Sequence, residues 1–359
     1  MILMEKTTSP DGPNQIDAPR DGTWTRKAPL PVAIAEVGVG EVEGKIYVIG
    51  GSEQRGQDPP TGSSTHNMMY SPATDRWQER APLPQALGHV GVAELGGKLY
   101  AIGGFTADVH MHPQSVALVY DPKIDRWSEL QPLSNPRGSV AVAAFDGRLH
   151  IFGGRTSEKV VKRSTPGVPD MFIGIGTVTT HEIYDPDKGE WLQSVPLPGP
   201  PRDHMGIAVV DEKIHVFGGR INDFRDLQAR HDVYDPKANT WTSASPLPRP
   251  RSAGAFTVLN GLIIYAGGEC KPGGEIATRN AFEDVSAYDP KTDTWTTLTP
   301  LPQGRHAFGA ATAAGVAYFA GGALVCGGGV STTELLGLTL ITRTKQQGNR
   351  MSSKQVVVN

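Results

Sequence analysis

Short apolar runs that end in paired glycines recur along the chain. The segment Gly44–Gly51 is a turn followed by alternating β-branched and aromatic residues. This pattern predicts a short β-strand, and the glycines permit positive φ where backbones crowd together. The chain contains six such pairs, at Gly50-Gly51, Gly103-Gly104, Gly153-Gly154, Gly218-Gly219, Gly267-Gly268 and Gly321-Gly322.

A Tyr-Asp-Pro-like turn and a tryptophan follow most of these pairs in a fixed order. The aspartate starts a turn and the proline presets φ at its second position, while the tryptophan covers an outer strand with a large apolar ring. The turns begin at Tyr70, Tyr120, Tyr184, Tyr234 and Tyr288, and the tryptophans are Trp24, Trp77, Trp127, Trp191, Trp241 and Trp295. The period of about 50 residues predicts a repeat fold.

This three-part signature resembles the Kelch repeat over residues 23–342. The resemblance implies an all-β fold, a six-bladed β-propeller with four-stranded antiparallel blades. The sixth Gly-Gly pair lacks a following turn and tryptophan, whereas Trp24 precedes the first pair. We therefore expect residues 23–28 to complete blade six and close the ring, so that no sheet edge stays open. The polar segments 1–22 and 343–359 are expected to be disordered tails of this single domain.

Composition narrows the class of protein. The net charge is −3 and is spread along the 359 residues, which argues against nucleic acid as a partner. No apolar run is long enough to span a membrane, and the polar residues after Met4 predict no secretory signal. We expect a cytoplasmic monomer without membrane contact, in which Cys270 and Cys326 are thiols. We find no complete metal or cofactor motif and expect neither group; His110 and His112 are interpreted as parts of a solvated loop, with a metal-binding pair as the alternative.

Aligning the blades on their Gly-Gly pairs locates a candidate site. Fourteen residues before the first glycine lie Glu36, His89, Ser139, His204, Ala253 and Ala307. The innermost strands begin here, on the same face as the loops after Gly-Gly, so these positions should surround one mouth of the central channel. The candidate ligand-binding residues are Glu36, His89, Arg137, Arg202, Asp203, His204, Arg220, Arg251, Arg305 and His306.

Two points remain open at this mouth. Arg137, Arg202, Arg251 and Arg305 share one repeat position, so the alternative is that they satisfy loop carbonyls as part of the scaffold. The segment from Arg155 to Thr180 is a long loop, which is either a functional lid or disordered.

The loop of blade five reads Gly268-Glu269-Cys270-Lys271-Pro272-Gly273 and is followed by Arg279. It is similar to a loop of the bacterial N-acetylneuraminate epimerases, sialic acid mutarotases built as six-bladed Kelch propellers. The resemblance implies Glu269 and Arg279 as catalytic residues, although extra residues here separate Pro-Gly from the arginine. Two functions are therefore expected. The first is a binding or protein-interaction module for an anionic small molecule or acidic peptide, and the alternative is a cofactor-free isomerase of an acidic sugar.

Overall fold

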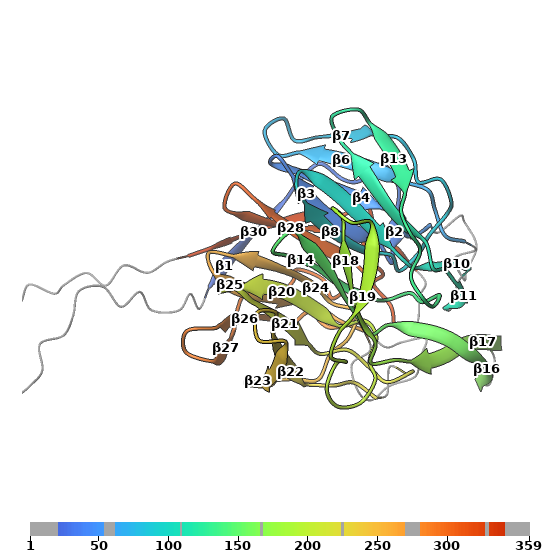
Figure 1. Cartoon of the computed structure of the whole chain (residues 1–359). Coiled ribbons are helices and arrows are strands. Elements are labelled where there is room, and N and C mark those ends of the chain that lie inside the picture. Colours follow the sequence, from blue (N-terminus) through green and yellow to red (C-terminus); the bar gives the residue numbers. More distant parts are fainter. Residues whose placement is uncertain are drawn as a thin grey trace, which may run out of the picture.

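The computed structural model describes residues 21–53, 62–107, 110–165, 168–223, 226–269, 281–326 and 330–341. Within these ranges the secondary structure is all β. Six four-stranded antiparallel sheets form the blades of a propeller, and each is built from four strands that are ordered from the channel outward (Figure 1). The predicted fold class is confirmed.

The first three blades follow one another along the chain. Their strands are β3 (Gly38–Val42), β4 (Lys45–Ile49), β6 (Asn67–Ser71) and β7 (Arg76–Glu79); β8 (Gly91–Leu95), β9 (Lys98–Ile102), β12 (Ala117–Asp121) and β13 (Arg126–Glu129); and β14 (Ala141–Phe145), β15 (Arg148–Phe152), β18 (His181–Asp185) and β19 (Glu190–Gln193).

Blades four to six repeat this order, except for the last strand. Their strands are β20 (Gly206–Val210), β21 (Lys213–Phe217), β22 (His231–Asp235) and β23 (Thr240–Ser243); β24 (Ala255–Leu259), β25 (Leu262–Ala266), β26 (Val285–Asp289) and β27 (Thr294–Thr297); and β28 (Gly309–Ala313), β29 (Val316–Ala320), β30 (Leu335–Leu340) and β1 (Gly22–Arg26).

Blade six is completed by the N-terminal strand. β1 pairs with β30 in antiparallel register from Gly22 opposite Leu340 to Arg26 opposite Leu336. The Trp24 ring packs edge-on against Phe319 with centroids 5.3 Å apart. The predicted closure by residues 23–28 is thereby confirmed in its strand pairing.

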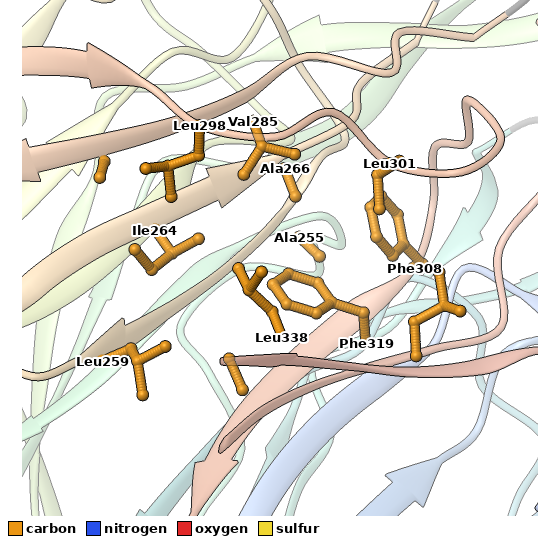
Figure 2. Packing of buried hydrophobic residues seen from close by; sticks show 13 residues of the cluster. Ala255, Leu259, Ile264, Ala266, Val285, Leu298, Leu301, Phe308, Phe319 and Leu338 are labelled. Atoms are coloured by element: carbon orange, nitrogen blue, oxygen red, sulfur yellow. The ribbon is translucent and has the colours of Figure 1, made fainter. Parts of the chain in front are cut away.

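Each repeat tryptophan also links its blade to the preceding one. The Trp127 Nε1 donates to the carbonyl of Ala81 at 2.8 Å, and the other five indoles bond equivalent carbonyls, those of Thr299, Ala28, Gln131, Val195 and Ser245. Apolar side chains fill the spaces between the blades, as in the cluster that joins blades five and six (Figure 2). There Ile264 and Phe319 lie on facing sheets, and both are fully buried.

Three small additional sheets include strands from the loops after Gly-Gly. They are β2 (Ile34–Ala35) with β5 (Ser52–Glu53), β10 (Phe105–Ala107) with β11 (Met111–Pro113), and β16 (Arg155–Thr165) with β17 (Val168–Thr177). The segment expected as a long loop is therefore mostly a β-hairpin, and it lies beside β10 and β11 at one edge of the molecule (Figure 1).

Two further expectations bear on the chain's environment. Cys326 is disulfide-bonded, which corrects the expected thiol at that position, and Cys270 lies outside the described residues. None of the described segments forms a helix with the length and apolar character that membrane crossing demands. The expected tails are 1–22 and 343–359; residues 1–20 and 343–359 lie outside the described residues, whereas Gly22 begins β1 opposite Leu340.

Candidate functional site

Six residues at the start of the innermost strands form a closed ring of backbone hydrogen bonds, which we call the mouth ring. Its members are Glu36, His89, Ser139, His204, Ala253 and Ala307. The N–H of each donates to the carbonyl of the member in the preceding blade, at distances of 2.6–3.3 Å. All six residues adopt positive φ, between 51° and 57°, a conformation that costs a non-glycine residue roughly 1–2 kcal/mol. The closed ring of bonds holds these residues in a conformation that their side chains disfavour.

The mouth ring is chemically one-sided. Glu36, His89, Ser139 and His204 follow one another around it, and the two alanines complete the circle. All six line a cavity of about 130 Å³ in the channel. The remaining walls are mostly apolar and include Val37, Val90, Val140, Met205 and Phe308. A cavity with apolar walls and a few convergent polar groups is typical of a small-molecule site.

A network of buried ion pairs supports the polar side of the ring. Asp203 lies with Oδ1 3.1 Å from His204 Nδ1 and 3.4 Å from Arg220 Nε, and its other oxygen accepts a hydrogen bond from Arg155. Arg220 in turn pairs through Nη1 with Glu269. The pairing of these charges satisfies the requirement that buried ions be compensated.

A cluster of three histidines lies against this network. His110, from the turn between β10 and β11, places Nε2 3.4 Å from Nε2 of His204. Its ring centroid lies 4.7 Å from that of His89. Arg220 Nη2 lies 3.2 Å from His204 Nε2 and 3.3 Å from His110 Nε2, and Arg155 Nη1 donates to His110 Nδ1 at 3.3 Å.

Burial and neighbouring charges determine the ionisation of the cluster. Burial, together with the neighbouring Arg220, lowers the pKa of His204 to about 3. Burial and Arg155 together hold the pKa of His110 well below its ordinary value. Burial opposes ionisation of Glu36, but His89, His204 and His306 together outweigh that effect, so the pKa of this carboxyl lies far below its usual range. At neutral pH His110 and His204 are therefore neutral imidazoles and Glu36 is a carboxylate.

The four arginines that share one repeat position do not line the cavity. Arg137 pairs with Glu182 at 2.6 Å, Arg202 pairs with Asp232 at 2.5 Å, and Arg305 pairs with Glu334. Arg202, Arg251 and Arg305 also donate to carbonyls of the Gly-Gly pairs. These contacts favour the scaffold interpretation of the four arginines, and we leave them out of the site.

The remaining predicted residues differ in position. Glu36, His89 and His204 line the cavity, with Asp203 and Arg220 directly behind them. His306 is 2% exposed and bonds the Val325 carbonyl at 2.9 Å. Glu269 is paired with Arg220 and lies outside the cavity lining. Arg279 lies outside the described residues.

His110 is buried, which corrects the solvated loop expected there; a metal-binding pair with His112 was the alternative. In the structure this residue is 9% exposed, and its carbonyl accepts a hydrogen bond from Ser157 Oγ at 2.5 Å. The residues that contact His110 come from blades two, three and four, so no local sequence motif predicts these contacts. The one available signal was the pair of histidines in a short segment that follows a Gly-Gly pair.

Comparisons with known proteins place this geometry in a family. The model of the Kelch motif matches residues 34–84, 86–134, 201–248 and 250–302. The Kelch-like protein terF of Aspergillus terreus is 29% identical over 312 residues, which cover 85% of this chain and 53% of terF. Kelch repeat and BTB domain-containing protein 12 of Danio rerio is 33% identical over 86 residues, or 23% of this chain and 14% of that protein. The chain thus spans about half the length of terF.

A solved structure titled "Structure of YjhT" superposes with a TM-score of 0.65 at 15% identity. The match covers 87% of this chain and 96% of that one, and at this identity it shows the fold alone. The four Kelch matches together span more than half of the sequence and coincide with blades one, two, four and five. The chain belongs to the Kelch-repeat family of β-propellers.

Proposed function

We propose that this propeller is a binding module whose ligand is a small hydroxylated acid held at the mouth ring. Kelch propellers commonly act as protein-interaction modules, and an acidic peptide is the alternative ligand. The size of the cavity, about 130 Å³, favours a small molecule over a peptide chain.

The one-sided mouth ring carries this proposal. A purely structural ring needs no polar side chains, because its bonds run through the backbone and two members are alanines. Nevertheless four consecutive members present a carboxylate, a hydroxyl and two imidazoles to the cavity. Backbone strain and perturbed ionisable groups also tend to gather at functional sites.

The polar groups complement the two ends of a hydroxy acid. The ionised Glu36 is an acceptor for ligand hydroxyl groups. The Ser139 hydroxyl lies 3.3 Å from His204 Nε2, and Arg220 lies behind that ring, so this part of the wall suits a carboxylate. Arg137, Arg202, Arg251 and Arg305 contribute no charge to the cavity, so the ligand's charge is met on this single side.

Replacing His89 by alanine tests the proposal. Alanine already occupies two mouth-ring positions in the same backbone conformation, so His89→Ala should fold. Isothermal titration is done with glucuronate and N-acetylneuraminate as probes and EDTA in the buffer. We expect binding of at least one acid by the parent chain and at least about tenfold weaker binding by H89A, because a loss of one charge-assisted hydrogen bond costs about 1.5–3 kcal/mol.

His66→Ala provides the matched control, since His66 pairs with Glu53 away from the cavity. It should leave the affinity unchanged. Glucose serves as the neutral counterpart of glucuronate and should bind more weakly. Equal affinity for glucose and glucuronate would contradict the claim that the site recognises an acid. An absence of binding by both acids would contradict the proposal as a whole.

Isomerisation of an acidic sugar is a second candidate, favoured by two carboxylate–imidazole pairs at one cavity. Glu36 Oε2 lies 3.0 Å from His89 Nε2, and Asp203 lies beside His204. Such pairs can move the proton of an anomeric hydroxyl by general acid–base catalysis. NMR exchange spectroscopy of N-acetylneuraminate anomers would detect the activity. Glu36→Gln should then lower the rate by at least about 100-fold and Glu269→Gln by less, since Glu269 does not face the cavity.

A further inference from the structure

Three histidines from two mouth-ring positions and one hairpin converge on a single point. One ring nitrogen each of His89, His110 and His204 lie within 4.8 Å of one another. Two of these rings belong to the mouth ring, whose backbone is fixed by hydrogen bonds. The third is positioned by Ser157, which bonds the His110 carbonyl. The cluster is therefore held by three different blades rather than by one flexible segment.

Carboxylates orient two of the three imidazoles. Asp203 Oδ1 lies 3.1 Å from Nδ1 of His204, which leaves the Nε2 lone pair directed at the cluster. Glu36 Oε2 lies 3.0 Å from Nε2 of His89, which leaves Nδ1 of that ring as the nitrogen open to an ion. A carboxylate on one nitrogen of an imidazole whose other nitrogen is open is the arrangement that supports metal-ligating histidines in proteins.

The spacing of the nitrogens matches a shared metal ion. Two nitrogens bound at about 2.0–2.1 Å to a tetrahedral ion are about 3.3 Å apart. The Nε2 atoms of His110 and His204 are 3.4 Å apart. We propose that His89, His110 and His204 bind one divalent transition-metal ion at the channel mouth, of the class that prefers imidazole ligands and includes zinc.

The charges around the cluster suit a cation. Glu36, Asp203 and Glu269 carry three negative charges against the two positive charges of Arg155 and Arg220. The proposal concerns a metal ion alone, and it stands or falls independently of the organic ligand proposed above.

Arg220 occupies the place of the cation in the metal-free chain. Its Nη2 lies 3.2 Å and 3.3 Å from the two nitrogens that the ion would share. Metal binding displaces this Nη2, while the Nη1 contact with Glu269 can persist. Arg155 likewise loses its hydrogen bond to His110 Nδ1. It retains its hydrogen bonds to Asp203 and to the Gly174 carbonyl. Arg220 is thus a built-in competitor of the ion, and its replacement should strengthen metal binding.

Zinc binding by the chain without an affinity tag tests the proposal, by competition with a chromophoric chelator at neutral pH. The parent chain should bind one equivalent of zinc, and His110→Ala should weaken binding at least about tenfold, because a three-ligand site loses one ligand. His112→Ala is the matched control, since His112 is an exposed histidine in the same hairpin. It should bind zinc as the parent chain does.

Equal zinc affinity of H110A and the parent chain would overturn the proposal, as would a parallel loss in H112A. Both variants alter the β10–β11 hairpin, in which His110 is buried and His112 exposed, and thermal melting would show that each is folded. Arg220→Gln supplies an independent check, with at least about threefold tighter zinc binding expected once the competing charge is gone. Weaker binding by a folded R220Q chain would contradict the arrangement in which the ion replaces Arg220 Nη2.

Discussion

Removal of residues 1–28 is expected to abolish cooperative unfolding of the propeller. The deletion takes away β1, whose five residues pair with β30. It also removes Trp24, which packs on Phe319 and bonds the Thr299 carbonyl at 3.2 Å. Trp24 is half-buried, so its loss should cost part of the about 3–5 kcal/mol that a fully buried tryptophan contributes, against a net domain stability of about 5–15 kcal/mol. The deletion also leaves β30 as an open edge that favours aggregation.

Thermal and urea unfolding, followed by tryptophan fluorescence and circular dichroism, measure this effect. Removal of residues 1–20 alone keeps β1 and is the control for chain length. Trp24→Ala keeps the strand pairing and should give an intermediate loss of stability. A peptide of residues 21–28 added to the shortened chain should restore part of the transition. If the chain without residues 1–28 melts at the parent temperature, closure by β1 does not hold the ring together.

The fold could be predicted from sequence because each repeat marker has one structural role. The glycine pairs end the second strand, the proline turns join the third and fourth strands, and each indole bonds the preceding blade. Trp24 was informative because it lacks a blade of its own, and in the structure it completes blade six. Counting the markers therefore predicted the closure as well as the number of blades.

The positions of the mouth ring were predicted from their constant distance to Gly-Gly, but their conformation was not. Positive φ is expected of glycine, and four ring members are Glu36, His89, Ser139 and His204. The bonds that impose this conformation join residues of adjacent blades that are about 50 or more residues apart, including the closing bond between Glu36 and Ala307. No local pattern in the sequence reports such a bond.

The structural role of the arginines could have been found from a second column of the repeat. In blades one and two the arginine position holds Ile34 and Leu87, which pack in the same apolar clusters as Met68 and Leu118. In blades three to five the Met68 position holds a polar residue that bonds the arginine, namely Glu182, Asp232 or Ser286. In blades one to five the two columns change together between apolar and polar, as expected for packed partners, whereas in blade six Arg305 pairs with Glu334 and Leu336 holds the equivalent position. The arginine positions alone do not show these polar partners, so the arginines were expected to bind a ligand.

Two buried histidine pairs should make the protein sensitive to mild acid. In blade three His150 Nδ1 lies 3.1 Å from His181 Nε2, and His181 Nδ1 donates to the Val195 carbonyl at 3.0 Å. Blade four repeats this arrangement with His215 and His231 at 2.9 Å. In each pair one imidazole nitrogen must stay unprotonated to accept the hydrogen bond from the other ring. Protonation of that acceptor nitrogen therefore breaks the bond.

Burial lowers the pKa of His150, His215 and His231 from 6.5 to about 4, and that of His181 to about 3. Nearby charges have smaller effects; Arg148 lowers the pKa of His150, while Asp293 raises that of His215 and His231. Because these folded-state values lie below the unfolded value, the unfolded chain binds more protons between them. Stability is therefore full above about pH 6.5 and falls as the pH decreases towards 4.

Each pKa unit corresponds to about 1.4 kcal/mol, so each of the four histidines should cost about 2 kcal/mol by about pH 4.5. Their sum approaches the net stability of a domain, and we expect unfolding before most carboxylates protonate. The double variant H150I/H181V tests the cause, because blade five has Ile264 and Val285 at the equivalent positions. Urea unfolding between pH 5 and pH 8 should show about two fewer protons taken up on unfolding of the variant than of the parent. An unchanged pH slope would assign the acid sensitivity to other groups, since the variant has lost both titrating rings of blade three and keeps those of blade four.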